Sequence, residues 1–213
     1  MPLQVGNLRK GQDVLSEGMC ANRCTVLIDG FLHRYRTLAD GRRQIFMFQT
    51  PGDIPDLHTL QLQPVDHSIA ATGECMVGYV PHAAIVEAFA KVEGLIEVFW
   101  RATLIDASIF RTWMLNMGRR DSLVQMAHLF CELYARLRAV GRAADKSFHA
   151  PLIQEELADA MGISTVHANR VLQQLRRRGL VTFDMQQVHI PDWAALQRFA
   201  EFDPDYLHLP PQP

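Results

Sequence analysis

The stretch from Leu152 to Leu180 constrains the fold most, because a glycine separates two helical periods there. In its first part, apolar residues recur at three- and four-residue spacing, which predicts one buried helix face. Gly162 is expected to end that helix, since glycine adopts left-handed backbone angles at little cost. Ser164 is a suitable N-cap for a second helix. The apolar residues expected to face inward on this second helix are Val166, Val171, Leu172 and Leu175.

The outer surface of the second helix carries side chains that suit DNA bases. Asn169 and Gln173 can pair bidentately with adenine, and Arg170 can pair bidentately with guanine. Two helices at this spacing are typical of a helix-turn-helix, whose second helix lies in the major groove. The alternative is an ordinary helical hairpin with a basic face exposed to solvent. A second alternative is a ligand-binding sensor whose helix-turn-helix makes protein contacts only.

Two further observations favour DNA binding. Residues 181–183 and 188–190 predict two short strands joined by a polar turn, which would form a wing beside the helices. Charge is also segregated: residues 101–180 hold 12 Lys and Arg against 7 Asp and Glu, whereas residues 1–100 hold 8 against 11. Because phosphate contacts dominate affinity for DNA, a basic segment within a nearly neutral chain predicts a double-stranded DNA partner.

The N-terminal part predicts an antiparallel β-structure. Short apolar or alternating runs are separated by glycine turns, and Asp40-Gly41 between two such runs is a strong hairpin signal. Regular short strands of this kind indicate a sandwich or barrel. The expected strands cover residues 14–15, 24–28, 32–37, 44–48, 68–71 and 75–80.

Residues 92–118 predict one long helix with two apolar stripes, which must be covered on more than one side. One stripe has the alternating three- and four-residue spacing of a coiled-coil seam. We therefore expect this helix to form a homodimer; the alternative is a central helix of a monomer, packed between two domains. The predicted dimerisation residues are Ile96, Phe99, Thr103, Asp106, Phe110 and Trp113.

The rest of the chain completes the expected organisation. Another helix is predicted from residue 123 to about 140, followed by a polar loop over residues 141–147. After Pro191, four large apolar residues predict a short packed helix in the acidic tail. The predicted segments are a sheet domain at 1–91, a dimerisation helix at 92–118, a winged helix-turn-helix at 119–191 and a tail at 192–213.

Several classes of protein are not expected from this sequence. No apolar run approaches the ~20 residues that a membrane span needs, and no signal peptide is seen, so we expect a cytoplasmic protein. Cys20 and Cys24 lack a second close pair that would complete a four-ligand metal or iron–sulfur site. A cupin-type metalloenzyme would need neighbouring histidine ligands, and no His-x-His spacing occurs. An enzyme is therefore not expected.

The order of these parts resembles the Crp/Fnr family of bacterial transcription regulators. Residues 29–35, 40–45 and 48–53 resemble the sheet-domain signatures of that family, and residues 157–172 resemble its DNA-binding signature. The resemblance implies an α+β fold with an N-terminal antiparallel β-roll, a long dimerisation helix and a C-terminal winged helix-turn-helix. It also implies a homodimer that reads palindromic promoter sites and contacts RNA polymerase.

The resemblance assigns a set of DNA-contacting residues. Arg170 and Asn169 are expected at bases, and residues 164, 165 and 167 at phosphates. Val166 stands near a position where well-known members carry a glutamate, and because valine cannot accept a hydrogen bond from cytosine, the DNA site should differ from theirs. The predicted DNA-binding residues are Ser164, Thr165, Val166, His167, Asn169, Arg170, Gln173 and Arg176.

The resemblance also places a candidate effector pocket in the β-roll. Pro55 offers no backbone donor where the cyclic-AMP pocket has glycine, and His67 is a poor substitute for a phosphate-binding arginine. Cyclic AMP is therefore not expected, nor are haem or an iron–sulfur cluster, and the effector stays unidentified. The candidate pocket residues are Gly52, Asp53, Pro55, Asp56, His67 and Ser68.

Overall fold

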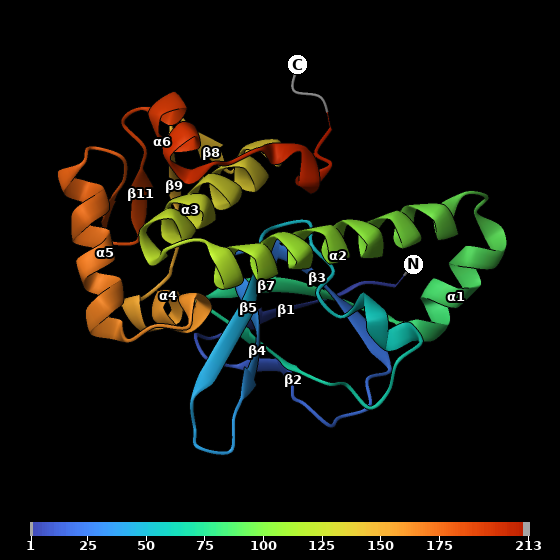
Figure 1. Ribbon diagram of the computed structural model, residues 1–213. Helices are drawn as coiled ribbons and strands as arrows, with labels where there is room; N and C mark the ends of the chain where they lie inside the picture. Colours follow the sequence, from blue (N-terminus) through green and yellow to red (C-terminus); the bar gives the residue numbers. More distant parts are fainter. Residues whose placement is uncertain (1, 211–213) are drawn as a thin grey trace. The chain divides into compact units, whose positions relative to one another are not determined.

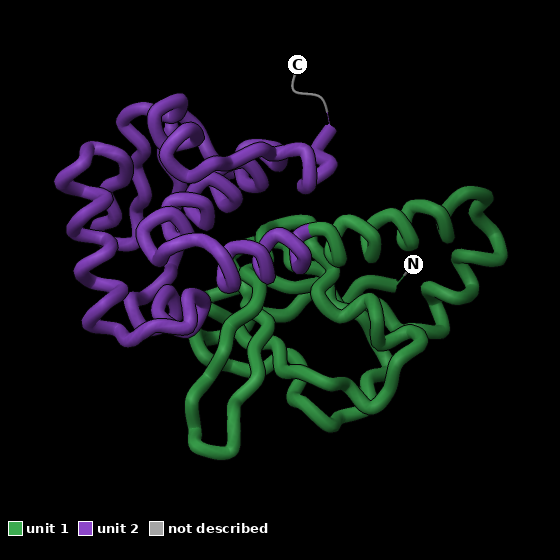
Figure 2. The backbone as a smooth tube through the Cα atoms, viewed as in Figure 1, with its two compact units in different colours: residues 1–108 green, residues 109–213 purple. Residues whose placement is uncertain are grey.

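The computed structural model describes residues 2–210, so the outermost residues of the first and last predicted segments lie outside the described residues. The chain divides into two compact units, residues 1–108 and 109–213 (Figure 2). The boundary falls within the long helix α2 (Leu95–Arg119). The antiparallel sheets, long helix and C-terminal helix-turn-helix confirm the predicted fold class.

The first unit contains two antiparallel sheets (Figure 1). One has the strand order β1-β7-β3 and the other β2-β6-β4-β5. Their apolar faces form a core that includes Leu27, Leu32, Ile69 and Val77. The elements before α2 are β1 (Gln4–Leu8), β2 (Asp13–Leu15), β3 (Arg23–Asp29), β4 (Leu32–Thr37), β5 (Arg43–Gln49), the 3-10 helix η1 (Leu57–Leu60), β6 (Ser68–Ala71), β7 (Cys75–Pro81) and α1 (His82–Lys91).

The six predicted strands are present, and the Asp40-Gly41 hairpin between β4 and β5 is confirmed. Strand β1 was not predicted, because among its residues only Leu8 is buried and the alternation of apolar and polar residues is weak. Gly30 makes the turn between β3 and β4, with a φ of 89°. A Cβ atom at Gly30 would lie 2.6 Å from the carbonyl oxygen of Glu74, so no larger residue fits this turn.

The second unit combines helices with a small antiparallel sheet of strand order β10-β11-β9-β8. The prediction of a polar loop over residues 141–147 is wrong in part, because β8 and β9 form a hairpin there. Besides the C-terminal part of α2, its elements are α3 (Ser122–Ala139), β8 (Ala143–Ala144), β9 (Ser147–His149), α4 (Gln154–Met161), α5 (Thr165–Arg177), β10 (Thr182–Asp184), β11 (Gln187–His189), α6 (Trp193–Ala200) and the 3-10 helix η2 (Pro204–Leu207).

In its described part, residues 192–210, the tail forms the short helix α6, as predicted from its apolar residues. Asp192 caps α6 by accepting a hydrogen bond from the backbone N–H of Ala195 at 3.0 Å. Phe202 and Leu207 are 7% and 2% exposed, so the segment after α6 also contributes to the core of the second unit.

One buried histidine should make the stability of the first unit depend on pH. His33 is 1% exposed, and its Nδ1 lies 2.9 Å from the hydroxyl of Thr72. Burial, with the charges of Arg43 and Lys10, lowers the pKa of His33 from 6.5 to about 3. The unfolded chain therefore takes up a proton at His33 first as the pH falls, and this contribution to stability is lost from about pH 6.5 downwards.

We compare the wild-type chain with a His33→Gln variant as the pH is lowered from about 6 to about 4. Over this range the free energy of unfolding of the wild-type chain is expected to fall, relative to that of the variant, by roughly 1.4 kcal/mol for each pH unit. Denaturant titrations of both proteins across this range measure the difference, in which titrations shared by the two proteins cancel. Parallel stability curves would show that His33 does not remain neutral in the folded state.

Candidate nucleic-acid interface

The turn between α4 and α5 is built as the sequence predicts. Gly162 ends α4 with left-handed backbone angles, φ 65° and ψ 32°. Ser164 caps α5, because its hydroxyl accepts a hydrogen bond from the backbone N–H of His167 at 3.2 Å. These two residues fix the direction in which α5 leaves the turn.

Helix α5 buries a narrower face than the sequence predicts. Val171 and Leu175 are buried as expected, and Leu172 is half-buried. The prediction that Val166 faces inward is wrong, because its side chain is 64% exposed. Ala168 is buried in its place, since positions 168, 171 and 175 share one face of a helix. The exposed Val166 is thus available for contact with a partner.

Most of the predicted DNA-contacting side chains are exposed on α5 or at its N-terminus. Ser164, Thr165, Val166, His167, Arg170, Gln173 and Arg176 are exposed. Asn169 is half-buried, and its amide donates a hydrogen bond to the side-chain oxygen of Gln154 at 2.9 Å. His167 lies beside α3, with its Nε2 3.1 Å from the hydroxyl of Ser122. Of the two residues expected at bases, Arg170 is therefore the more accessible.

The wing lies next to these helices in the same unit. Strands β10 and β11 pair antiparallel from Thr182↔His189 to Asp184↔Gln187, which confirms the predicted hairpin. Met185 at its tip is 91% exposed. A groove of about 540 Å³ is lined by the start of α4, the later part of α5 and the wing, and includes Gln173 and Arg176. These two predicted residues thus line a surface shared by helix and wing.

The predicted effector residues are largely engaged inside the β-roll. The carboxylate of Asp56 accepts hydrogen bonds from the backbone N–H of Thr25 at 2.7 and 3.0 Å. Burial raises the pKa of Asp56 to about 6. Asp53 accepts from the backbone N–H of Thr50 at 2.7 Å, and Ser68 accepts from that of Glu17 at 3.0 Å. Gly52 is exposed.

Arg34 connects three segments of the first unit. Its Nε and Nη2 donate to the carbonyl oxygen of Pro55 at 2.9 and 2.5 Å. Its Nη1 forms an ion pair with Asp106 on α2 at 2.6 Å. Arg34 is 4% exposed, so its charge is compensated within the fold. No local sequence pattern indicates this pair, because its members are 72 residues apart.

Three of the predicted dimerisation residues interact with residues of their own chain that are distant in sequence. The ring of Phe99 packs edge-on against Phe89, with centroids 5.1 Å apart. Asp106 pairs with Arg34. Trp113 is 5% exposed, and its Nε1 donates to the carboxylate of Glu132 at 3.2 and 3.1 Å. The large apolar side chains of α2 that are exposed, the predicted Ile96 among them, are Ile96, Val98, Trp100, Leu104, Met114, Leu115 and Met117.

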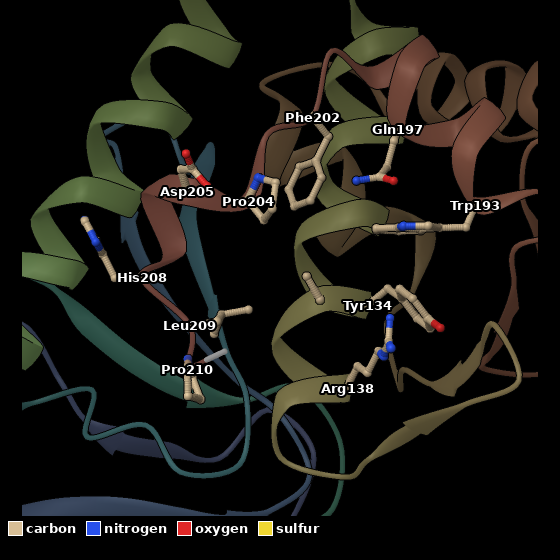
Figure 3. Close-up of a pocket in the computed structure, with 11 residues that line it drawn as sticks. Tyr134, Arg138, Trp193, Gln197, Phe202, Pro204, Asp205, His208, Leu209 and Pro210 are labelled. Carbon is tan, nitrogen blue, oxygen red and sulfur yellow. The ribbon is translucent and has the colours of Figure 1, made fainter. Parts of the chain in front are cut away.

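A second cavity, of about 580 Å³, lies between α3, α6 and the tail. Figure 3 shows the aromatic rings of Tyr134, Trp193 and Phe202 on one side and the tail residues Asp205, His208, Leu209 and Pro210 on the other. The rings of Tyr134 and Trp193 have centroids 4.8 Å apart. The sequence predicted the packing of the tail but not this cavity, which depends on the path of the chain after α6.

Two family models match the chain. The cyclic nucleotide-binding domain matches residues 5–92, and the Crp-like helix-turn-helix domain matches residues 124–199. The transcriptional activator protein FnrL of Cereibacter sphaeroides is 25% identical over 92% of this chain and 79% of its own length. The nitrogen fixation regulation protein FixK of Bradyrhizobium diazoefficiens is 24% identical over 89% of this chain and 79% of its own.

Solved structures show the same architecture. The structure of FixK2 from Bradyrhizobium japonicum superposes with a TM-score of 0.79 at 20% identity, covering 93% of this chain and 98% of that one. The fold and these relatives define a DNA-binding transcription regulator. Because the relatives are regulators and not enzymes, they agree with the prediction that this chain is not an enzyme. The chain belongs to the Crp/Fnr family. In the described part of the chain, no helix is long and apolar enough to cross a membrane.

Proposed function

We propose that the chain acts as a homodimer that reads an inverted-repeat promoter site through α5 of both protomers. The proposal extends to contact with RNA polymerase, a setting in the cytoplasm and control by an effector other than cyclic AMP. The observation that carries the proposal is the exposed surface of α5, where Arg170 stands between one and two turns after Ser164, which caps the N-terminus. An arginine in this position can reach O6 and N7 of guanine in the major groove.

The N-terminus of α5 suits the DNA backbone. Unpaired N–H groups and the helix dipole make a helix N-terminus a favourable place for a phosphate. Ser164, Thr165 and His167 are exposed there and can donate hydrogen bonds to phosphate oxygens. The exposed Val166 can contact the methyl group of thymine. For Asn169 to read adenine, its amide would have to exchange Gln154 for the base.

The exposed residues of α2 support a revised dimer seam. Ile96, Trp100, Met114 and Met117 are 54%, 65%, 72% and 44% exposed. With Thr103, Ala107 and Phe110 they follow an alternating spacing of four and three residues, which is the spacing of a coiled-coil seam. This seam keeps positions 96, 103 and 110 of the predicted one. It replaces Phe99, Asp106 and Trp113, whose side chains interact with Phe89, Arg34 and Glu132.

We expect a Trp100→Glu, Met114→Glu double variant to be monomeric, because four like charges would be placed in the apolar seam of each dimer. Sedimentation velocity measures the change in mass. Affinity for the full DNA site should fall at least ~100-fold, since each protomer would then bind one half-site alone. Leu62→Glu is the matched control, because Leu62 is 64% exposed, close to the 65% of Trp100, but lies in a loop of the first unit. A dimeric double variant would place the interface elsewhere.

Residues of the β-roll support an effector other than cyclic AMP. The cyclic nucleotide-binding model matches this region, but Pro55 has no N–H to donate to a ribose hydroxyl. The buried Arg34 is paired with Asp106 and the carbonyl of Pro55, so it does not offer a free guanidinium to a phosphate. One structural neighbour is described as a regulator that responds to c-di-GMP, which supports diversity of effectors on this fold.

Selection of bound sequences from a random duplex library tests the proposed function directly. We expect purified protein to enrich an inverted repeat whose half-sites are centred ~34 Å apart, about one helical turn of DNA. Such a result would also show that no added effector is obligatory. Enrichment of single half-sites only would argue against the dimer. Salt-sensitive binding without any enriched sequence would contradict base reading by α5 under these conditions.

A further inference from the structure

Three side chains of the first unit form a cluster that DNA reading does not use. His58 lies in η1, and Asp66 and His67 lie in the segment that leads into β6. Each offers a metal-ligand atom, and these atoms all lie within 4.8 Å of one another. The rings of His58 and His67 face each other with centroids 4.9 Å apart and an interplanar angle of 32°. Two imidazoles and a carboxylate are therefore already gathered at one point.

The two histidines have nitrogens without protein partners. Among the described residues, neither the buried Nε2 of His58 nor that of His67 has a hydrogen-bond partner. His67 as a whole is 9% exposed. Leaving a buried polar atom unsatisfied is unfavourable unless another group binds there. Two such atoms on neighbouring rings point to a ligand that accepts lone pairs from both.

Asp66 prepares His67 for such a ligand. Its carboxylate lies 2.7 Å from Nδ1 of His67. A carboxylate in this position holds the proton on Nδ1, so that Nε2 carries the free lone pair. The same arrangement orients the histidines that ligate zinc in many proteins. The ring of Phe46 packs edge-on against His67 with centroids 5.5 Å apart, which further limits its rotation.

The surroundings of the cluster do not oppose a cation. The positive charge in the neighbouring β-roll interior that could repel a cation is that of Arg34 on β4. Its Nη1 is paired with the carboxylate of Asp106, which compensates this charge. Asp66 adds a negative charge whose side chain is 83% exposed, so an ion can approach from solvent. The site is thus reachable on one side and closed by packed rings on the other.

We propose that Nε2 of His58 and Nε2 of His67 bind one divalent transition-metal ion, with Zn²⁺ as the representative case, while Asp66 orients His67 through its Nδ1. Imidazole nitrogens suit zinc, copper, iron and nickel. Two imidazole ligands leave at least two positions of a tetrahedral ion open for water or a small anion. The site would give the β-roll a ligand whose binding does not depend on how α5 reads DNA.

Metal titration of the full-length protein tests the proposal without any DNA. After treatment with a chelator, calorimetry with Zn²⁺ is expected to show one ion per chain, and Co²⁺ is expected to give visible absorption bands. His67→Gln should weaken binding at least ~100-fold, and Asp66→Asn by about 10- to 100-fold. His149→Gln is the matched control, because His149 is an exposed histidine of the second unit.

The outcomes of the titration either support or overturn the metal site. Stoichiometric binding that His67→Gln and Asp66→Asn abolish or weaken, with His149→Gln unchanged, supports the site. No binding by the wild-type chain, or equal loss in the control, overturns it. Because His67 is buried, its variant is checked by circular dichroism for folding. Asp66→Asn changes an exposed side chain and keeps the test valid if His67→Gln does not fold.

Discussion

Replacing Arg170 with alanine is expected to weaken binding to the cognate DNA site by roughly 30-fold to 10⁴-fold. One bidentate contact between arginine and guanine contributes about 1–3 kcal/mol. A dimer on an inverted repeat makes the contact twice, so the loss is about 2–6 kcal/mol, and each 1.4 kcal/mol corresponds to tenfold in affinity. Fluorescence anisotropy with a duplex found by the library selection measures the change.

Two matched variants separate base reading from simple loss of charge. Arg170→Lys keeps the charge but not the planar fork, so it should lose most of the discrimination against a substituted guanine. Arg198→Ala removes the same charge from an exposed position on α6 and should leave sequence preference unchanged. If Arg170→Ala and Arg198→Ala weakened all duplexes equally, Arg170 would be acting on phosphates rather than on bases.

The helix-turn-helix could be predicted because its signals are local. Gly162 and Ser164 stand within two residues of each other, and each determines its backbone geometry or cap almost alone. The buried face of α5 was predicted less well. Hydropathy alone places the valine at position 166 in the core, but this side chain is exposed and the smaller Ala168 is buried. Hydropathy alone does not show that a helix packs through its smaller side chain.

The long helix shows what periodicity cannot decide. Two adjacent stripes of α2 are apolar, and the sequence does not show which stripe its own chain covers. The answer depends on partners distant in sequence: Arg34 for Asp106, and Glu132 for Trp113. Only with these contacts known does the exposed stripe through Trp100 become the candidate seam.

The hairpin of β8 and β9 was missed for a different reason. Its two turn residues, Asp145 and Lys146, have φ values of 49° and 59°. Both central residues of a type I′ turn have positive φ, and the usual signal for it is Asn-Gly or Asp-Gly. The wing turn uses Met185 and Gln186 in the same way, with φ values of 46° and 63°. The wing was recognised from its flanking strands, whereas residues 143–149 are too polar to give that signal.

Replacing Phe202 with alanine is expected to destabilise the second unit by about 3–5 kcal/mol, because a large buried side chain is removed from its core. Phe202 is 7% exposed, and its ring packs edge-on against Trp193 and His128, with centroids 6.1 and 5.1 Å apart. Since domains are commonly stable by only about 5–15 kcal/mol, this loss would lower the melting temperature by more than ~10 °C. Thermal unfolding followed by circular dichroism measures it.

A second variant tests how the tail is held to α3. The hydroxyl of Tyr206 donates a hydrogen bond to the buried carboxylate of Glu132 at 2.7 Å, and Trp113 and Arg136 donate to the same carboxylate. Burial raises the pKa of Glu132, and these donors act against that shift by stabilising the charged form. Tyr206→Phe removes one donor while keeping the ring, so it should cost about 1–3 kcal/mol.

The tail is then part of the core of the DNA-binding unit rather than an appendage, and the two variants should behave differently from a surface change. His208→Asn is the matched control, because His208 is exposed and asparagine tolerates its left-handed φ of 48°. We expect the control to change stability by less than about 0.5 kcal/mol. If Phe202→Ala and Tyr206→Phe were as mild as His208→Asn, the second unit would fold without its tail, and α3 would not need the tail to hold α5 in place.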